Sequence, residues 1–284
     1  MTTLDALHGA IDSLKCAGIE TATTDAEWLL EDVVSLKRHQ LYLQNRPLTD
    51  KEITRYTISI KRRCNHEPVA YIIGYKTFLD WEFAVSPQVL IPRWETEVLV
   101  NELCNHFHPY WRVGIEIGTG SGAIAISLAL RLPDIQVYAT DISASALQIA
   151  WLNAKQLGVM KRITFLQGNM LSILSGLNLE GRVDFIVSNP PYIISKEIDD
   201  LPSDVRDFEP RVALDGGEDG LDYYKKIIEN APNYLMSGGY LAFEVGPCQA
   251  KPVKELMQKC FETQIINDLC QRERVVLGSR YGSE

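Results

Sequence analysis

The chain has 284 residues, of which 46% are apolar, so it is long enough for two domains and is not a disordered chain. Its formal net charge of −9 argues against a protein that binds nucleic acid through a broad basic surface, although a local basic patch would not show in this average. The six cysteines form no Cys-x-x-Cys pair, so we expect neither a metal site nor a disulfide framework.

The N-terminal segment carries Asp5 and Asp12 and has no long apolar stretch, so it does not resemble a signal peptide. No segment of the sequence reaches the length of about 20 apolar residues that a membrane-spanning helix needs. The sequence therefore predicts a cytoplasmic protein that does not act at a membrane.

Residues 1–66 are expected to form a small helical-bundle domain. Apolar residues recur at helical spacing from Leu4 to Leu14, and Gly18 is placed to end that helix. Thr49 and Glu52 have the spacing of a capping box, in which each side chain satisfies a backbone N–H of the other residue, so a further helix begins there. No strand pattern occurs in this stretch.

The segment 67–92 differs in character and is predicted to be a linker. Prolines and a glycine interrupt it, and aromatic or β-branched residues fill the intervals. We expect the runs 71–73 and 83–85 to be the two strands of a β-hairpin. A helix is predicted to begin near Trp94, with acidic side chains in its first turn.

Residues 93–284 show alternating strand and helix patterns, which are typical of an α/β domain. Strands are expected at 113–117, 136–140, 163–167, 183–187 and 240–245, and helices at 123–132, 144–157, 221–235 and 252–260. Right-handed crossovers then give a mostly parallel, Rossmann-like sheet with helices on both faces. No helix separates the runs 263–269 and 274–277, so they can only pair as a C-terminal antiparallel hairpin.

A glycine-rich turn follows the first of these strands. Its alternate glycines let the backbone turn tightly and approach a ligand closely. Their spacing differs from the Gly-x-Gly-x-x-Gly of dinucleotide sites, and Glu116 just before them would repel a pyrophosphate. S-adenosylmethionine (SAM) has no phosphate and carries two cationic groups, so an acidic neighbour is tolerable. We therefore expect the cofactor SAM to contact Glu116, Gly118, Thr119, Gly120, Ser121 and Gly122.

Positions at two further strand ends are candidates for the same cofactor. Asp141 ends the second strand, where its carboxylate would accept hydrogen bonds from both ribose hydroxyls; the alternative is a helix N-cap within 141–143. Asn169 follows the third strand and would read the adenine edge, with Met170 lying against the adenine ring. Asparagine at a strand end is also common turn chemistry, so these two contacts have a structural alternative.

The tetrad Asn189-Pro190-Pro191-Tyr192 follows the fourth strand and is the candidate catalytic and substrate-binding pocket. An amide nitrogen is a poor nucleophile, because its lone pair is shared with the carbonyl group. Asn189, which also borders the cofactor, would accept one amide hydrogen, and the Pro190 carbonyl would accept the other. The two prolines fix this carbonyl, and Tyr192 would cover the flat face of the substrate. A simple Asn-Pro turn is the alternative.

The glycine turn and the tetrad both follow parallel strands, so they are expected at the same edge of the sheet. Their combination predicts methyl transfer from SAM to an amide or amino nitrogen. This chemistry rests on positioning and on preorganised acceptors, and it needs neither a metal ion nor a covalent intermediate.

The chain resembles the HemK/PrmC family of protein-glutamine N5-methyltransferases over nearly its whole length. Besides the two motifs above, the resemblance is carried by the runs 67–74, 78–83, 91–97, 209–221, 244–246, 268–269 and 274–278. Trp94 stands where the family usually has a second proline, and Asn169-Met170 stands where many members have an acidic and then an aromatic residue.

The resemblance implies that the protein methylates the glutamine of the Gly-Gly-Gln motif in peptide-chain release factors. It implies that 118–122 and Asp141 bind SAM and that 189–192 hold the glutamine. The helical N-terminal domain would help to grip the release factor. We consider two roles for the acidic loop 197–209: it lines the entry path and favours a basic protein loop, or it is simply a solvated acidic loop.

Two other functions remain as alternatives. A nucleic-acid amino-methyltransferase, acting on adenine N6 or guanine N2, would use the same pocket but would be expected to carry a basic recognition domain. Residues 1–65 show no basic run beyond Lys61-Arg62-Arg63, so we expect no direct binding of nucleic acid. A non-catalytic SAM-binding module is disfavoured by the intact tetrad.

Overall fold

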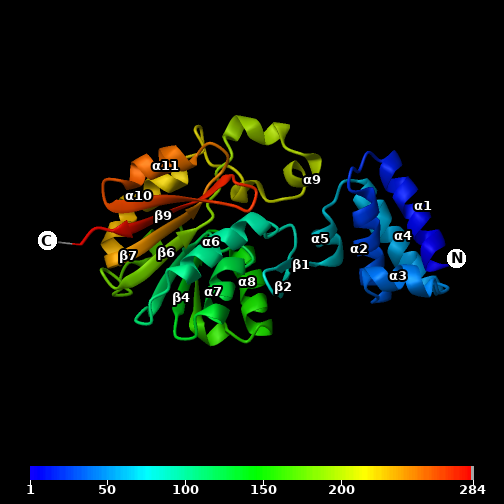
Figure 1. Cartoon of the computed structure of the whole chain (residues 1–284), viewed down its shortest axis with the longest axis horizontal. Helices are drawn as coiled ribbons and strands as arrows, with labels where there is room; N and C mark the ends of the chain where they lie inside the picture. Colours follow the sequence, from blue (N-terminus) through cyan, green and yellow to red (C-terminus); the bar gives the residue numbers. More distant parts are fainter. Residues whose placement is uncertain (283–284) are drawn as a thin grey trace. The chain divides into compact units, whose positions relative to one another are not determined.

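The computed structural model describes residues 1–282 and divides the chain into two compact units. The first unit contains Met1–Tyr75 together with the short segment Pro202–Phe208. The second contains Lys76–Leu201 and the chain from Glu209 onward. The polypeptide therefore passes from the first unit to the second at residue 76. It returns to the first unit for the seven residues 202–208 and then continues in the second unit. Figure 1 shows the N-terminal helices of the first unit in blue and cyan and the segment 202–208 in yellow-green.

The first unit is helical, as the sequence predicts. Its helices are α1 (Thr3–Cys16), α2 (Ala22–Val34), α3 (Arg38–Gln44), α4 (Asp50–Cys64), α5 (Val69–Ile73) and α9 (Ser203–Arg206). The capping box predicted from Thr49 and Glu52 is confirmed at the start of α4. Apolar side chains from α1, α2 and α4 form the buried core, with Leu7, Leu14 and Leu30 almost fully enclosed.

A buried ion pair joins two helices of this unit. The Arg63 guanidinium of α4 lies 2.7 Å from the Asp25 carboxylate of α2, and each side chain is only 8% exposed. Arg63 also lies 4.0 Å from Asp204 of α9. A buried charge is costly without a partner, so the contact with Asp25 ties α4 to α2, and only the longer approach to Asp204 reaches the segment 202–208.

The predicted β-hairpin is present, but its first strand was placed wrongly in the sequence. The run 71–73 belongs to the short helix α5, and the hairpin strands are β1 (Tyr75–Phe78) and β2 (Trp81–Ala84). Pro68 starts α5, and Gly74 ends it with a φ of 88° and an N–H that donates to the Ala70 carbonyl. A left-handed glycine is a typical helix terminator, which explains why the strand begins only after Gly74.

The second unit contains a seven-stranded sheet in the order β5-β4-β3-β6-β7-β9-β8. Its strands are β3 (Val113–Ile117), β4 (Gln136–Asp141), β5 (Ile163–Gln167), β6 (Val183–Ser188), β7 (Leu235–Glu244), β8 (Phe261–Asn267) and β9 (Glu273–Arg280). The first five strands in this order pair in parallel, and β9 is antiparallel to β7 and to β8. The predicted mostly parallel sheet with a C-terminal antiparallel hairpin is confirmed.

Helices cover both faces of this sheet (Figure 1). One face carries α6 (Trp94–Asn105), α7 (Ala123–Arg131) and α8 (Ala144–Gln156), and the other carries α10 (Asp222–Tyr234) and α11 (Ala250–Met257). Short 3₁₀ turns occur at η1 (Met160–Arg162), η2 (Ser172–Leu174), η3 (Ser195–Asp200) and η4 (Arg211–Ala213).

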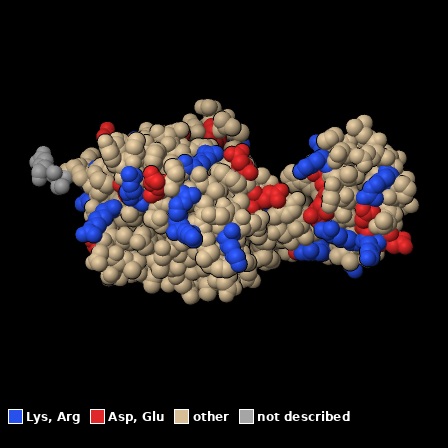
Figure 2. Space-filling model, turned by 90° about the horizontal axis from the view of Figure 1, so that it is seen from below, with Lys and Arg blue, Asp and Glu red and all other residues tan. Residues whose placement is uncertain are grey.

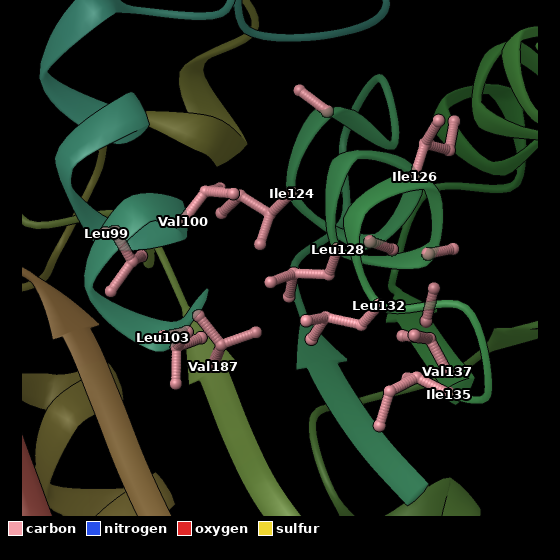
Figure 3. Packing of buried hydrophobic residues seen from close by; sticks show 14 of the residues in the cluster. Leu99, Val100, Leu103, Ile124, Ile126, Leu128, Leu132, Ile135, Val137 and Val187 are labelled. Carbon is pink, nitrogen blue, oxygen red and sulfur yellow. The ribbon is translucent and has the colours of Figure 1, made fainter. Parts of the chain in front are cut away.

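Each face of the sheet packs against its own apolar cluster. Successive side chains of the central strand β6 point to opposite faces, so Phe185 and Val187 join one cluster and Ile186 joins the other. Figure 3 shows side chains of α6, α7, β4 and β6 converging in the first cluster, among them Val100 and Ile124. Every residue of β6 is buried, as expected for a parallel strand covered on both faces.

The surface carries charges of both signs. Figure 2 shows Lys and Arg side chains scattered over the face in view, with Asp and Glu side chains between them, so no broad basic patch covers this face. Within residues 1–282, no helix is long and apolar enough to cross a membrane. Across the same residues, no cluster of His, Cys, Asp and Glu side chains is arranged to hold a metal ion.

The carboxyl ends of the central strands lie level with one another. Ile117, the last residue of β3, pairs with Thr140 of β4 on one side and with Ser188 of β6 on the other. The segments that follow these three strands therefore meet at one edge of the sheet. The glycine turn follows β3, Asp141 ends β4, and the tetrad 189–192 follows β6, so the residues that the sequence singles out lie at this edge.

Candidate active site

A single cavity at this edge of the sheet brings together most of the residues predicted for the site. The predicted residues that line it are Gly118, Gly120, Asp141, Asn169, Met170, Asn189, Pro190 and Pro191. The turn after β3 and the tetrad after β6 thus face the same space. Ligands of open parallel sheets bind outside the carboxyl ends of the strands, and the cavity has this position.

The glycine turn exposes its backbone to the cavity at two positions. Gly118 and Gly120 have φ angles of 74° and 54°, and a Cβ added at either residue would meet no protein atom within 4 Å. Gly122 also has a positive φ, but a Cβ there would lie 2.7 Å from the Ile126 side chain. The first two glycines therefore leave room for a ligand, whereas the third allows close packing of α7.

Other predicted residues of the turn brace it from behind and do not line the cavity. Glu116 is only 1% exposed, and its Oε2 accepts hydrogen bonds from Thr119 Oγ1 at 2.5 Å and from the Ala125 N–H at 3.0 Å. Burial raises the pKa of Glu116, the two hydrogen bonds lower it, and the net value is about 8. Ser121 is buried as well, and its carbonyl accepts from Asn153.

Asp141 belongs to the cavity wall and also holds the backbone around it. Its Oδ2 accepts the Gly120 N–H at 2.8 Å, and its Oδ1 accepts the Ser143 N–H at 2.9 Å. The N-cap of α8 is Ser143, whose Oγ accepts the Ala146 N–H at 3.1 Å. Burial raises the pKa of Asp141, and its backbone donors oppose the shift. Each carboxylate oxygen keeps a lone pair for a further donor.

Asn169 and Met170 line the cavity beside Asp141. The Asn169 carbonyl accepts hydrogen bonds from the backbone and the hydroxyl group of Ser172. Asn169 therefore forms a turn, which is the alternative to adenine binding that the sequence offers. Met170 has a φ of 51°, a left-handed conformation that side chains other than glycine adopt rarely. The strained turn directs this segment along the cavity wall.

The tetrad presents three of its four residues to the cavity. Asn189, Pro190 and Pro191 line it, whereas Tyr192 lies outside the wall and packs towards Gly246. The Tyr192 carbonyl accepts a hydrogen bond from Gln249 at 2.9 Å, and burial raises the pKa of the Tyr192 phenol. The structure thus leaves Tyr192 outside the cavity wall, and its contact with the flat face of the substrate stays a prediction.

The amide of Asn189 has a defined partner on α6. Its Nδ2 donates to Thr96 Oγ1 at 3.2 Å, and the Thr96 hydroxyl in turn donates to Glu244 Oε2 at 2.5 Å. Thr96 and Glu244 are buried, and burial raises the pKa of Glu244 to about 7. Neither residue was expected in the site from the sequence, although both lie in the runs 91–97 and 244–246 that carry the family resemblance.

Sequence reasoning also missed the segments that close the cavity on its other sides. They are Gln88, Val89 and Leu90 before α6, Pro210, Val212 and Ala213 around η4, and Tyr223 of α10. A buried contact holds two of these segments together: the Glu209 carboxylate accepts hydrogen bonds from the Arg93 side chain and from the Ile91 N–H. The Glu209 side chain is only 1% exposed.

The aspartates of the acidic loop do not line this cavity in the described part of the chain. Asp204 and Asp207 fall in the segment assigned to the first unit, where Asp204 approaches Arg63 and Asp207 pairs with Arg206. The role of this loop at an entry path stays a prediction.

Comparison with known protein families identifies both units. Residues 5–74 match the family model of the PrmC N-terminal domain, and residues 95–202 match that of the methyltransferase small domain. The second unit has the fold of a solved Pyrococcus furiosus methyltransferase, with a TM-score of 0.53 and 19% identity over 72% of this chain and 92% of that one. The solved hMettl16 catalytic domain gives a TM-score of 0.56 at 18% identity, with 84% of each chain covered.

Full-length relatives are much more similar in sequence. The release factor glutamine methyltransferase of Moorella thermoacetica is 42% identical and matches over 99% of each chain. The protein of the same name from Geobacter sulfurreducens is 40% identical over 93% of this chain and 92% of its own length. The protein from Koribacter versatilis is 38% identical over 99% of each chain. The chain therefore belongs to the release factor glutamine methyltransferase family and is a methyltransferase.

Proposed function

We propose that this protein transfers a methyl group from SAM to the side-chain amide nitrogen, N5, of the glutamine in the Gly-Gly-Gln motif of peptide-chain release factors. The observation that carries the proposal is the single cavity shared by the glycine turn, Asp141 and the tetrad from Asn189 to Pro191. The names of the full-length relatives support the choice of substrate.

The cavity wall on the side of β3 and β4 fits SAM. The open backbone at Gly118 and Gly120 allows a ligand to approach closely, and the Asp141 carboxylate has capacity for two hydroxyl donors. Asn169 and Met170 are available for the adenine ring. SAM, when bound, supplies an activated methyl group on a cationic sulfur atom. A wall with a carboxylate and no basic side chain suits that charge.

The wall on the side of β6 fits the substrate amide. Asn189 Oδ1 and the Pro190 carbonyl are acceptors for the two N–H groups, and the fixed φ of the prolines keeps this carbonyl in place. Holding both hydrogens fixes the amide plane and aims the nitrogen, which compensates for its weak nucleophilicity. The nitrogen gains the methyl group and loses one proton, for which water is an adequate acceptor.

The same pocket chemistry would serve an exocyclic amino group of a nucleic acid base. The net charge of −9 and the mixed charges on the face shown in Figure 2 favour a protein substrate instead. The solved hMettl16 domain shares the fold at 18% identity, a level that does not transfer a substrate to this chain. Nucleic acid is therefore kept as an acceptor in the test.

The test is peptide mass spectrometry on an unmethylated release factor after incubation with this protein and SAM. DNA and ribosomal RNA serve as parallel acceptors, and an Asn189→Ala variant serves as the matched control. We expect one added methyl group on the Gly-Gly-Gln glutamine and none with the variant. Methyl groups found on nucleic acid but not on the glutamine would refute the proposed substrate. They would leave unchanged the proposal that the pocket holds a nitrogen group for methylation.

A further inference from the structure

Three side chains joined by hydrogen bonds lead from the sheet to the cavity. Glu244 lies at the carboxyl end of β7, Thr96 in the first turn of α6, and Asn189 directly after β6. The Thr96 hydroxyl joins the other two, at 2.5 Å from Glu244 Oε2 and 3.2 Å from Asn189 Nδ2. Only Asn189 lines the cavity, so Glu244 and Thr96 have no direct contact with a ligand there.

While Glu244 is ionised, the two hydrogen bonds between Glu244, Thr96 and Asn189 can have only one direction each. A carboxylate only accepts, so the Thr96 hydroxyl must donate its single hydrogen to Glu244. Thr96 then offers only a lone pair to Asn189, which requires the NH2 group of the Asn189 amide on that side. Asn189 Oδ1 is left on the other side, and within residues 1–282 it has no protein partner.

We propose that Glu244 and Thr96 are positioning residues that hold the Asn189 amide with its oxygen towards the substrate. The two ends of an amide have nearly the same shape, so packing alone does not choose between them. With the oxygen turned inward, the pocket accepts a group that donates hydrogens, such as a glutamine amide, and repels a carboxylate of the same size. This proposal rests on the proposed function and concerns how its substrate is selected.

The reverse order becomes possible when position 244 gains a hydrogen-bond donor. A donor there would supply a hydrogen to Thr96, and Thr96 would then donate to Asn189 Oδ1 and leave the NH2 group facing the substrate. Glutamine at position 244 permits both orders, because its amide offers a donor and an acceptor. Valine at position 96 removes the link with little change of shape, whereas serine keeps the hydroxyl group.

Protonation of Glu244 also gives it a hydrogen-bond donor, so the protonated form permits both orientations of the Asn189 amide. Burial raises its pKa to about 7, while the Thr96 hydrogen bond and the charges of Arg274 and Arg93 favour the ionised form and Glu95 opposes it. The Tyr224 hydroxyl donates to the Glu244 backbone carbonyl, and the buried Tyr192 also faces this group. Methyl transfer should therefore fall as the pH drops below about 7, because the protonated form no longer fixes the Asn189 amide.

The experiment measures single-turnover methylation of a release factor, with SAM saturating, by the full-length protein and its Thr96→Ser, Thr96→Val and Glu244→Gln variants. It also compares binding of release factors that carry Gly-Gly-Gln or Gly-Gly-Glu. We expect Thr96→Ser to retain activity and the other two to lose about tenfold in rate, equivalent to one hydrogen bond. We expect the same two variants to lose preference for glutamine over glutamate, with SAM affinity unchanged.

The pH profile separates this role from a merely structural one. The fall in rate below about pH 7 should be present in the wild type and in Thr96→Ser and absent in Glu244→Gln. Wild-type rates, glutamine preference and pH profile in Glu244→Gln would overturn the proposal, even if Thr96→Val does not fold. Failure of the wild type to methylate any release factor would instead refute the proposed function.

Discussion

Asp141 Oδ2 accepts the backbone N–H of Gly120 at 2.8 Å, so the carboxylate that ends β4 also fixes the turn that follows β3. Its second oxygen accepts the N–H of Ser143, the residue that caps α8. One side chain thus joins two neighbouring connections of the sheet at the cavity. The helix cap that the sequence offers as an alternative is made by Ser143, whereas Asp141 supports the backbone and lines the cavity, and its contact with the ribose hydroxyls stays a prediction.

We predict that Asp141→Ala weakens SAM binding by at least about tenfold, because the variant loses charged hydrogen bonds to the cofactor hydroxyls. Isothermal titration calorimetry measures this effect. The matched control is Thr49→Ala, which removes the side-chain cap of α4, costs about 1 kcal/mol of stability and leaves the SAM dissociation constant nearly unchanged, because Thr49 does not line the cavity. An unaltered SAM dissociation constant in Asp141→Ala would leave Asp141 with a purely structural role.

We predict that Asn189→Ala lowers the single-turnover rate by about a hundredfold or more, because one of two preorganised acceptors for the amide is lost. SAM binding should survive, since the glycine turn and Asp141 are unchanged. The measurement is a rapid-quench assay with release factor and SAM both saturating. Asn169→Ala, which removes an amide elsewhere on the cavity wall, should keep the rate under these conditions. A normal rate in Asn189→Ala would exclude the pocket mechanism.

We predict that two glycines of the turn respond differently to alanine. Both Gly120 and Gly122 have positive φ, so each substitution costs about 1–2 kcal/mol of backbone strain. Gly122→Ala also forces contacts with Ile126 and Ala150, so it should lower the melting temperature more. Gly120→Ala adds a methyl group where no protein atom lies within 4 Å, so it should mainly weaken SAM binding.

Thermal unfolding and calorimetry on both glycine variants distinguish these effects. A larger loss of stability in Gly120→Ala than in Gly122→Ala would contradict the assignment of the first glycine to the ligand and of the second to helix packing.

The architecture could be predicted because local and global patterns agree. Alternating strands and helices with glycines at their junctions leave few topologies other than a doubly covered parallel sheet. The error in the hairpin arose from a short apolar run between Pro68 and Gly74, 69–73, which suits a strand or one helical turn equally well. In the folded protein, Gly74 adopts a φ of 88° and ends a helix, so the run before it is helical.

The cavity was predictable on the sides where a motif follows a strand, as at Gly118, Asp141 and Asn189. It was not predictable where distant segments meet. Thr96 and Glu244 are 148 residues apart in the chain, and no spacing rule connects them. Tyr223 reaches the cavity from a helix whose pattern indicates only core packing. Glu116 shows the opposite case, since its position before the turn suggests ligand contact, but the fold buries it behind the turn.

The buried carboxyl group of Glu116 has a consequence for stability. Burial raises its pKa from 4.5 to about 8. Between these values the folded protein keeps a proton that the unfolded chain has released. The stability contribution of this site therefore falls as the pH rises through that window and levels off above it.

We predict that Glu116→Gln removes this dependence, because a glutamine oxygen can accept from Thr119 and Ala125 without ever ionising. The variant should gain at least about 1 kcal/mol of stability relative to the wild type between about pH 5 and pH 8. Unfolding of both full-length proteins across this range measures the difference, in which the similar contribution of Glu244 cancels. Parallel pH profiles would show that Glu116 is already ionised in the folded protein.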